Sequence, residues 1–264
     1  MQAKFEKTIM EVLDNIEKIH QDAEMTMDSR KEKHNLDDNS KFKNIQIEEK
    51  NMTIIKNISD INTPEKNRKD ILDIIKCRKS IRDYSEKSIS IEEFFELIKY
   101  SFGYRDYETG IYGFQDFPVS YTPSAGGLAC VSHYIIVRNV TGLDKGLYRY
   151  NRVSENLEYL SKGNFYYKLP QFLFETGFAQ NSAFIVLLYA DMNKIAWKYG
   201  ERGYRFAHLD AGVLAQNLHL LAMKYSIGSC MIAGYQDNEI RKIFSLGQSD
   251  IPMLVMTFGY PGTR

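Results

Sequence analysis

The sequence predicts an α+β fold, in which layers of helices surround a central and mostly antiparallel sheet. Two observations support this prediction: short apolar strands alternate with turn residues over positions 132–160, and one long helix covers Phe206–Tyr225. Mixed helices and strands of this kind form layered domains around a hydrophobic core. With 264 residues, the chain is long enough for such a domain and an additional segment.

The long helix is apolar around most of its circumference. It contains no proline and one glycine, and its hydrophobic residues form more than one stripe. A helix of this type lies in a protein core or at a subunit interface. We expect its polar entry at Lys198-Tyr199 and, where the chain leaves the helix, Gly228 in the left-handed C′ position.

The composition argues against several classes of partner. The chain has 34 basic and 34 acidic residues, so its formal net charge is zero and it indicates neither nucleic acid nor an anionic membrane. Three widely spaced cysteines and five histidines show no metal-ligand spacing, and we expect no metal site. No apolar run is long enough to span a bilayer, and the charged residues after Met1 lead us to expect no signal peptide. These features are typical of a cytoplasmic protein.

The first hundred residues contain no glycine and divide into two parts. A heptad-like apolar stripe over residues 5–23 predicts a helix that packs on the body or a partner subunit, or that docks a companion protein. The segment Asp28–Lys50 is rich in charged residues and asparagine, and we interpret it as a linker. We therefore divide the chain into a helical and linker extension, residues 1–50, and one folded domain, residues 51–264.

A basic segment follows a predicted helix over Asn67–Cys77. Its residues Arg78, Ser80 and Arg82 alternate, so in an extended stretch they point to one side. Two guanidinium groups and a hydroxyl on one side suit a phosphate and an electron-rich carbonyl. The alternative interpretation is a solvated basic face.

The remaining elements follow in order. Ser88 or Ser90 is expected to cap a helix over Ile91–Phe102. An aromatic, turn-rich loop over Gly103–Gln115 then lines or covers a planar ligand, or packs on the surface. Two further helices are expected at Tyr166–Phe174 and Asn238–Phe244, and strands at Ser132–Arg138, Gly146–Tyr150, Leu157–Leu160, Ala183–Ala190, Ser229–Ala233 and Pro252–Gly259. The Ala183–Ala190 run is apolar throughout, which predicts a central strand.

Two more segments are candidates for binding or chemistry. The small residues of Pro123–Gly127 let the backbone approach a ligand closely and direct N–H groups at it, although glycine pairs also mark ordinary turns. Lys198-Tyr199 places ionisable groups at the entry of the long helix. These residues form either part of an active-site rim or a set of surface charges.

Together these motifs, in this order, resemble the nitroreductase superfamily and, within it, the SagB-type dehydrogenases that mature azole-containing peptides. The resemblance covers roughly residues 70–264 and implies the nitroreductase-like FMN-binding fold. It rests on five segments: Arg78-x-Ser80-x-Arg82, Pro123–Gly127, Gly146–Tyr148, Lys198-Tyr199 with Arg202–Gly212 and Gln216-Asn217, and Gly259–Pro261.

The resemblance implies a homodimer that holds each FMN at the subunit interface. Arg78 and Ser80 would hold the phosphate and ribityl end, and Arg82 would stabilise the anionic reduced flavin near its pyrimidine side. The other implied cofactor contacts are Pro123, Ser124, Ala125 and Gly126 of the partner chain, Gly234 beneath the isoalloxazine ring, and Arg264 at the phosphate.

For the azoline-oxidising branch, the resemblance implies that Lys198 and Tyr199 are the catalytic pair. Conversion of a thiazoline or oxazoline to an azole removes a proton, and it removes a hydride that goes to flavin N5. Either Lys198 is the base, with a lowered pKa, or its ammonium group stabilises a phenolate on Tyr199. One departure from the family is Val213, which stands where many members have histidine.

The implied function is the FMN-dependent oxidation of azoline rings in a ribosomally made peptide, in association with a cyclodehydratase. An NAD(P)H-dependent reductase of nitro compounds or quinones is one alternative, and a flavin-binding scaffold subunit is another. The Lys198-Tyr199 pair favours the dehydrogenase, because a reductase supplied by nicotinamide needs no such base and a scaffold needs no catalytic pair.

Overall fold

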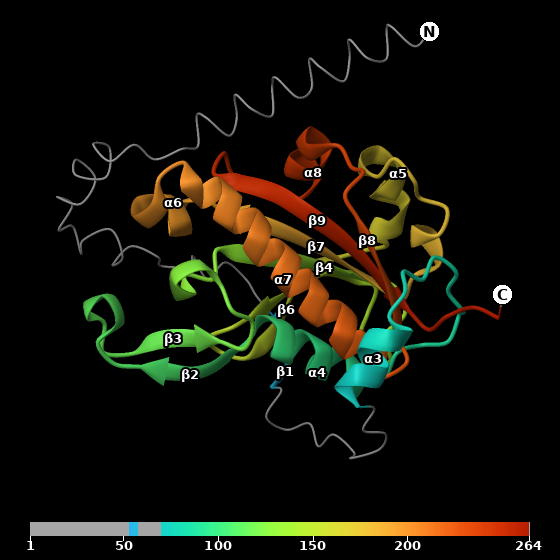
Figure 1. Cartoon of the computed structure of the whole chain (residues 1–264). Helices are drawn as coiled ribbons and strands as arrows, with labels where there is room; N and C mark the ends of the chain where they lie inside the picture. Colours follow the sequence, from blue (N-terminus) through green and yellow to red (C-terminus); the bar gives the residue numbers. More distant parts are fainter. Residues whose placement is uncertain (1–52, 58–69, 264) are drawn as a thin grey trace, which may run out of the picture.

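The structure is a computed structural model that describes residues 53–57 and 70–263. Its centre is a seven-stranded sheet with the strand order β1-β6-β5-β4-β7-β9-β8, and every described pairing within it is antiparallel (Figure 1). The strands are β1 (Thr53–Asn57), β4 (Val131–Val137), β5 (Gly146–Asn151), β6 (Asn156–Lys162), β7 (Phe184–Asp191), β8 (Gly228–Ile232) and β9 (Asp250–Gly259). The predicted α+β class and antiparallel sheet are confirmed.

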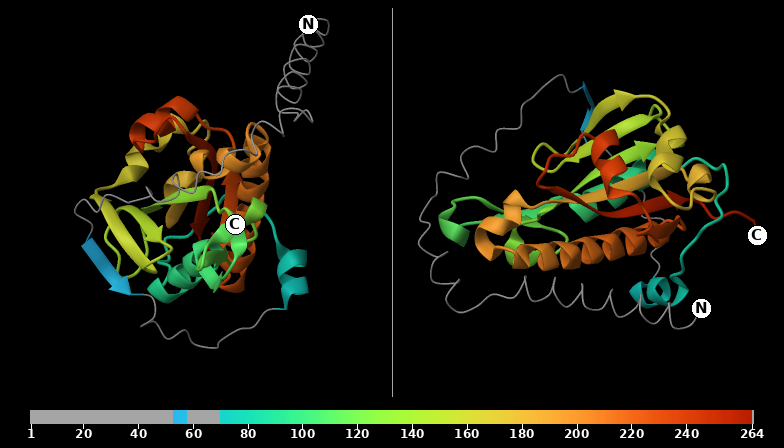
Figure 2. Two further views of the ribbon diagram at one scale, coloured as in Figure 1. Left: turned by 90° about the vertical axis from the view of Figure 1, so that its left-hand side faces the viewer. Right: turned by 90° about the horizontal axis from the view of Figure 1, so that it is seen from above.

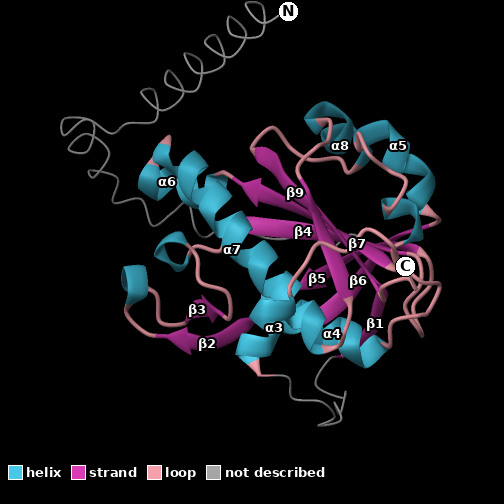
Figure 3. Cartoon of the chain, turned by 45° about the vertical axis from the view of Figure 1, so that its right-hand side comes forward, coloured by secondary structure: helices cyan, strands magenta, loops and turns pink. Residues whose placement is uncertain are grey.

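Helices cover both faces of this sheet. Figure 2 shows α7 on one side of the sheet and α5 and α8 on the other, and Figure 3 shows α3 beside the C-terminal part of α7. The helices are α3 (Ile71–Cys77), α4 (Ile91–Phe102), α5 (Leu169–Phe172), α6 (Asn193–Tyr199), α7 (Arg202–Lys224) and α8 (Asp237–Ile243). The fold therefore has three layers, with the sheet in the middle.

Strand β7 lies at the centre of the sheet, between β4 and β9, as its apolar run predicts. Its side chains alternate between the two faces. Phe184, Val186 and Leu188 belong to the hydrophobic cluster beneath α4 and α7, whereas Ile185 and Leu187 belong to the cluster beneath α5 and α8. One strand thus contributes to both cores, which explains why it has no polar face.

Helix α4 begins where the sequence places it. Ser90 is the N-cap: its hydroxyl accepts a hydrogen bond from the Glu93 N–H at 3.2 Å, and the Glu93 carboxylate accepts one from the Ser90 N–H at 3.2 Å. This capping box satisfies two backbone donors that the first turn leaves without helical partners.

The predicted start of the long helix is wrong. Lys198 and Tyr199 end the separate helix α6, the chain then turns through Gly200 with φ +56°, and α7 begins at Arg202. A glycine with a positive φ separates the two helices, because other residues adopt this conformation only at a cost.

The predicted end of the long helix at Tyr225 is correct to within one residue, but the predicted glycine cap is wrong. Helix α7 stops at Lys224, Ser226 adopts the left-handed conformation with φ +61°, and Gly228 is the first residue of β8. A Cβ atom at Gly228 would lie 2.7 Å from the Cβ of Ile81. Glycine is therefore required here by the close approach of residues 78–82, and not by a helix cap.

The predicted loop at Gly103–Gln115 contains a strand that the sequence does not reveal. β2 (Tyr104–Glu108) pairs with β3 (Phe117–Ser120) in a separate antiparallel hairpin. Most residues of β2 are exposed, so the strand lacks the apolar alternation from which a strand is predicted. In Figure 1 this hairpin projects from the body of the fold.

Other boundaries differ less. The helix predicted over Asn67–Cys77 has its N-cap at Asp70. The helix predicted over Tyr166–Phe174 is a short 3₁₀ turn followed by α5, with Pro170 in the first turn as expected. The predicted helix over residues 5–23, the predicted linker and Arg264 lie outside the described residues. β1 pairs with β6 at the sheet edge, while the domain boundary near residue 50 stays a prediction. None of the helices that the structure describes is long and apolar enough to cross a membrane.

Candidate active site

The segment that follows α3 presents its polar side chains to solvent. Ser80 forms a parallel bridge with Ser229 of β8, and the Ile81 N–H donates a hydrogen bond to the Ser229 carbonyl at 3.0 Å. The Ile81 side chain packs against Gly228, whereas Arg78, Ser80 and Arg82 are exposed.

Buried contacts fix the chain just after this segment. The Tyr84 hydroxyl donates to the Ile81 carbonyl at 2.7 Å and lies 2.7 Å from the Thr257 hydroxyl. Burial raises the pKa of Tyr84, so the phenol stays neutral. Tyr84 therefore ties this segment to β9.

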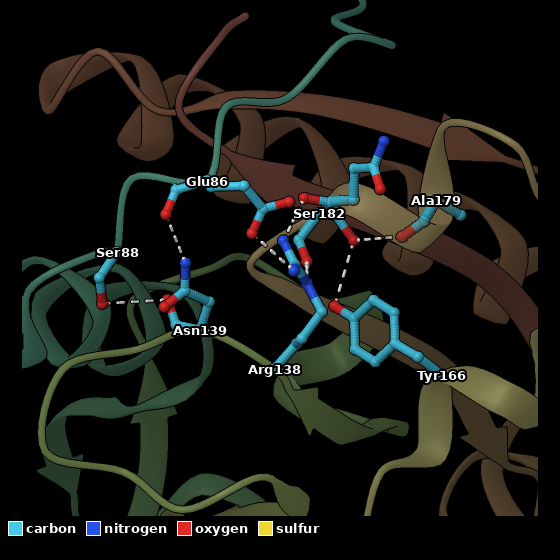
Figure 4. Close-up of polar contacts among 8 residues, drawn as sticks. Glu86, Ser88, Arg138, Asn139, Tyr166, Ala179 and Ser182 are labelled. Atoms are coloured by element: carbon cyan, nitrogen blue, oxygen red, sulfur yellow. Dashed lines mark hydrogen bonds and ion pairs between the residues drawn. The ribbon is translucent and has the colours of Figure 1, made fainter.

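A second anchor lies further along the same stretch (Figure 4). The Arg138 guanidinium pairs with the Glu86 carboxylate at 2.9 Å and donates to the Ser182 carbonyl at 2.8 Å. The Asn139 side chain donates to the Glu86 carbonyl at 2.9 Å, and the Tyr166 hydroxyl lies 3.1 Å from that of Ser182. The connection between the basic segment and α4 is therefore held against the ends of β4 and β7.

The positive charges of the basic segment are available to a ligand. Within residues 53–57 and 70–263, neither Arg78 nor Arg82 forms an ion pair with a carboxylate. Arg82 lies beside the Cys230 thiol, and Arg78 lies near His219 of α7. Burial and the charge of Arg78 lower the pKa of His219, whose Nε2 lies 3.3 Å from the Lys79 carbonyl and, in the neutral ring, donates to it.

Gly234 lies just beyond the end of β8. It is exposed, its carbonyl accepts a hydrogen bond from the Phe174 N–H at 3.2 Å, and a Cβ atom there would meet only the Phe174 ring, at 3.4 Å. Five residues separate Gly234 from Ser229, which corresponds to about 16 Å along an extended chain. The basic segment and Gly234 thus flank the same strand.

The Pro123–Gly127 segment is held by α7. The Ala125 N–H donates to both oxygens of the buried Asp210 carboxylate, at 2.9 and 3.1 Å, and the Ser124 hydroxyl accepts from the Ala129 N–H at 2.9 Å. Burial raises the pKa of Asp210, while the Ala125 N–H acts in the opposite direction. Sequence reasoning assigned Asp210 no role; its signal is that it is the only acidic residue of α7.

Three side chains converge on Gly126. A Cβ atom at this residue would lie 2.7 Å from the Lys198 Nζ, 2.7 Å from the Tyr199 hydroxyl and 2.8 Å from the Tyr112 hydroxyl. Gly126 also has φ +61°, a conformation that disfavours any side chain. The structure thus brings the predicted Lys198-Tyr199 pair onto the predicted loop, and adds Tyr112, which sequence reasoning placed only in an aromatic loop.

The surroundings of Lys198 bear on the two roles that the sequence leaves open for it. Partial burial lowers the pKa of Lys198, but hydrogen bonds to the Tyr112 and Tyr199 hydroxyls raise it, and the net shift is upward. In the chain without a ligand, this direction favours the alternative in which Lys198 is a cation beside Tyr199. The reason is that two hydroxyl oxygens replace the water around the ammonium group.

The two candidate halves of the site lie at opposite ends of α7. The Tyr199 ring contacts that of Phe206 near the start of the helix, whereas His219 contacts Lys79 near its end. Thirteen residues separate these contacts, and at 1.5 Å per residue they are about 20 Å apart. In Figure 1, α6 and α3 lie at the two ends of α7. One chain does not bring Lys198 and Tyr199 to the basic segment.

An exposed apolar surface lies between these two ends. On α7, Leu209 is 60% exposed and Val213 is 41% exposed, although they are one helical turn apart and could share a buried face. On α3, which contacts the other end of α7, Ile71, Leu72 and Ile75 are each more than half exposed. Exposed apolar side chains on both helices indicate an interaction surface.

The comparisons with known proteins now give the family. The sequence profile of the nitroreductase family matches residues 75–260. The chain belongs to the nitroreductase family. It is therefore an oxidoreductase by family, and its fold is the one expected from the motifs.

Individual relatives are consistent with this family assignment. The chain is 25% identical over 200 residues to a candidate nitroreductase of Methanocaldococcus jannaschii, covering 76% of this chain and 96% of that protein. It is 36% identical over 67 residues, a quarter of each chain, to the microcin B17-processing protein of Escherichia coli. Among solved structures it resembles a chain of the E. coli microcin synthetase complex with a truncated pro-peptide bound, with a TM-score of 0.57, 22% identity and coverage of 84% of this chain and 80% of that one.

The buried Asp210 carboxylate generates a prediction for stability against pH. Burial raises the pKa of Asp210, so the protonated carboxyl group favours the folded state. This contribution to the free energy of unfolding is lost as the pH rises through the raised pKa. We expect Asp210→Asn to gain free energy of unfolding relative to the wild type at pH 7, and this gain to disappear on acidification. Urea unfolding from pH 4 to 8 measures it, with the exposed Asp106→Asn as control. A gain that is constant with pH contradicts the assignment.

Proposed function

We propose that this member of the nitroreductase family is an FMN-dependent dehydrogenase that oxidises thiazoline or oxazoline rings of a ribosomally made peptide to azoles. The observation that carries the proposal is the convergence of Lys198 and Tyr199 on Gly126. A proton-accepting group at a small-residue loop is what an azoline oxidation requires, whereas reduction by a nicotinamide cofactor requires none.

The relatives support a peptide substrate. One similar protein processes microcin B17, and one similar chain belongs to a synthetase complex with a pro-peptide bound. We infer that this chain likewise acts on a peptide that carries azoline rings, in association with the cyclodehydratase that forms them. This inference rests on similarity of fold and of a quarter of the sequence, and it sets the substrate used in the tests below.

The residues of the basic segment suit FMN. Arg78 and Arg82 offer guanidinium groups that pair with no carboxylate in the described part of the chain, and Ser80 offers a hydroxyl between them. Such groups bind a phosphate, and a cation near the flavin ring stabilises its anionic reduced form. The exposed backbone of Gly234 leaves room for the ring, and Arg264 is proposed as a further phosphate contact. When bound, FMN would supply the oxidant that accepts the hydride.

A homodimer would complete the site. The basic segment and the Lys198-Tyr199 pair are about 20 Å apart along α7, which is too far for one flavin ring to contact both from one chain. A second copy related by two-fold symmetry brings the pair of one subunit, with its Pro123–Gly126 loop, to the basic segment of the other. The exposed Leu209 and Val213 supply apolar surface for this contact.

The basic segment generates a prediction for cofactor binding. Arg78→Ala is expected to weaken FMN binding by roughly 1.5–3 kcal/mol, because one charge-assisted hydrogen bond to the phosphate is lost. Lys79→Ala removes the neighbouring exposed cation and serves as the control. In an extended segment the side chain of Lys79 points to the side opposite those of Arg78 and Ser80. Fluorescence titration of the apoprotein measures both affinities, and mass spectrometry identifies the released flavin. Recovery of FAD, or an equal loss of FMN affinity in both variants, would contradict the proposed FMN site.

The Lys198-Tyr199 pair generates a prediction for catalysis. Lys198→Ala and Tyr199→Phe are expected to retain FMN, yet to lose azole formation by a factor of about 10²–10⁴, the usual contribution of a positioned general base. The assay is the loss of two hydrogens per ring, followed by mass on an azoline-bearing peptide. Tyr204→Phe, an exposed tyrosine of α7, is the matched control.

Two results would reject this function. Wild-type turnover in both variants would remove the pair from the mechanism. Rapid NAD(P)H oxidation with nitroaromatics or quinones, together with no reaction on any azoline peptide, would instead assign the reductase activity.

A further inference from the structure

Tyr112 occupies an unusual position at the tip of the β2–β3 hairpin. It lies in a 3₁₀ turn, Ile111–Gly113, and its backbone is left-handed, with φ +51°. Gly110 and Gly113 on either side also have positive φ, of +90° and +79°. A bulky residue in this conformation is rare and persists where its surroundings hold it, often at a functional site.

The surroundings that hold Tyr112 are the candidate catalytic group. Its hydroxyl donates a hydrogen bond to the Gly126 carbonyl at 2.8 Å and accepts one from the Lys198 ammonium. Its ring makes edge contacts with Trp197 and Phe117, at centroid distances of 6.0 and 5.4 Å, and the Lys198 Nζ lies 4.2 Å from the ring centroid. The ring and the hydroxyl are thus both fixed beside Lys198.

The direction of these hydrogen bonds follows from the donors available. A phenol has one proton, and a carbonyl can only accept, so the Tyr112 proton is directed to Gly126. The Tyr112 oxygen can then only accept from Lys198, and an ammonium group has three protons to give and no lone pair. Two of these protons point to the hydroxyls of Tyr112 and Tyr199. The arrangement favours the protonated form of Lys198.

We propose that Tyr112 is a positioning residue that holds Lys198 as a cation beside Tyr199, so that Tyr199 is the proton acceptor. This deepens the proposed function and rests on it for the reaction. The Tyr199 phenol first releases its proton to solvent, and the phenolate, which Lys198 stabilises, then takes the proton of the ring carbon next to the imine and the carbonyl. FMN, when bound, would accept the hydride of the neighbouring ring carbon as the ring double bond forms. Lys198 keeps its proton throughout.

The first test measures the protonation of Lys198 without any turnover. Tyr112→Phe removes the accepting oxygen and keeps the ring, so the labelling of Lys198 by acetic anhydride at pH 8 should rise about threefold to tenfold. Isotope-coded labelling of the flavin-bound protein, read at the Lys198 peptide by mass spectrometry, measures this rate. Tyr107→Phe removes a hydroxyl from the same hairpin, where the ring contacts that of Tyr104, and should leave the labelling unchanged. An unchanged rate in Tyr112→Phe would overturn the proposal.

The second test separates the two possible bases through the pH profile of azole formation. If Lys198 acts as a cation, its deprotonation sets the alkaline limb, and Tyr112→Phe moves that limb to lower pH by about half a unit to one unit, with a fall in rate of about threefold to tenfold on the alkaline side of the limb. If Lys198 is the base, its deprotonation sets the acidic limb, and the same variant becomes faster at neutral pH. The second outcome would overturn the assignment of Tyr199.

The two tests also separate this inference from the proposed function. Faster labelling in Tyr112→Phe, with no azoline oxidation by the wild type, would retain the role of Tyr112 toward Lys198 and reject the reaction. Azoline oxidation by the wild type, with unchanged labelling in Tyr112→Phe, would retain the reaction and reject the role of Tyr112. Equal flavin content in both variants serves as the control for folding.

Discussion

Helix α7 is the constraint on which the rest of the candidate site depends. It is a continuous helix of 23 residues, and each part of it holds a different functional segment. Phe206 contacts Tyr199 near its start, Asp210 binds the Ala125 N–H, and His219 contacts Lys79 near its end. Because the rise of a helix is fixed, these segments cannot approach one another within the chain. The same helix presents exposed Leu209 and Val213, so it offers a surface for the copy that would bring the segments together.

Much of the fold could be predicted because its signals are local. The apolar run of β7 and the cap at Ser90 are encoded by adjacent residues, and both are found where expected. The break between α6 and α7 was missed because Gly200 lies in a stretch with the polar composition of a helix entry. β2 was missed because its exposed residues carry no pattern. Gly228 was assigned to a helix cap, although its cause is contact with Ile81, which is distant in sequence.

The residues of the candidate site also divide into those that the sequence indicates and those that only the folded structure reveals. Motif order was sufficient to select the Arg78–Arg82 segment, the Pro123–Gly127 loop and Lys198-Tyr199, whose roles stay predictions. It could not select Tyr112, because Tyr112 lies 86 residues from Lys198 in the sequence and contacts it only in the folded chain. That contact also raises the pKa of Lys198, which the sequence could not decide, because the environment of an ionisable group depends on tertiary neighbours. The sequence therefore indicated which residues to consider, and the three-dimensional arrangement indicates which charge Lys198 carries.

The central claim is that each active site combines residues from two copies of the chain, and subunit complementation tests it most directly. Arg78→Ala and Lys198→Ala chains with different affinity tags are co-expressed. Azole formation by the mixture is compared with that of each variant alone, at an FMN concentration too low to load the Arg78→Ala variant. Random pairing makes about half of the dimers mixed, and each mixed dimer has one intact site if the two residues come from different chains. The account predicts recovery of about a quarter of the wild-type rate. If the mixture is no more active than either variant, the two residues act within one chain and the account is contradicted.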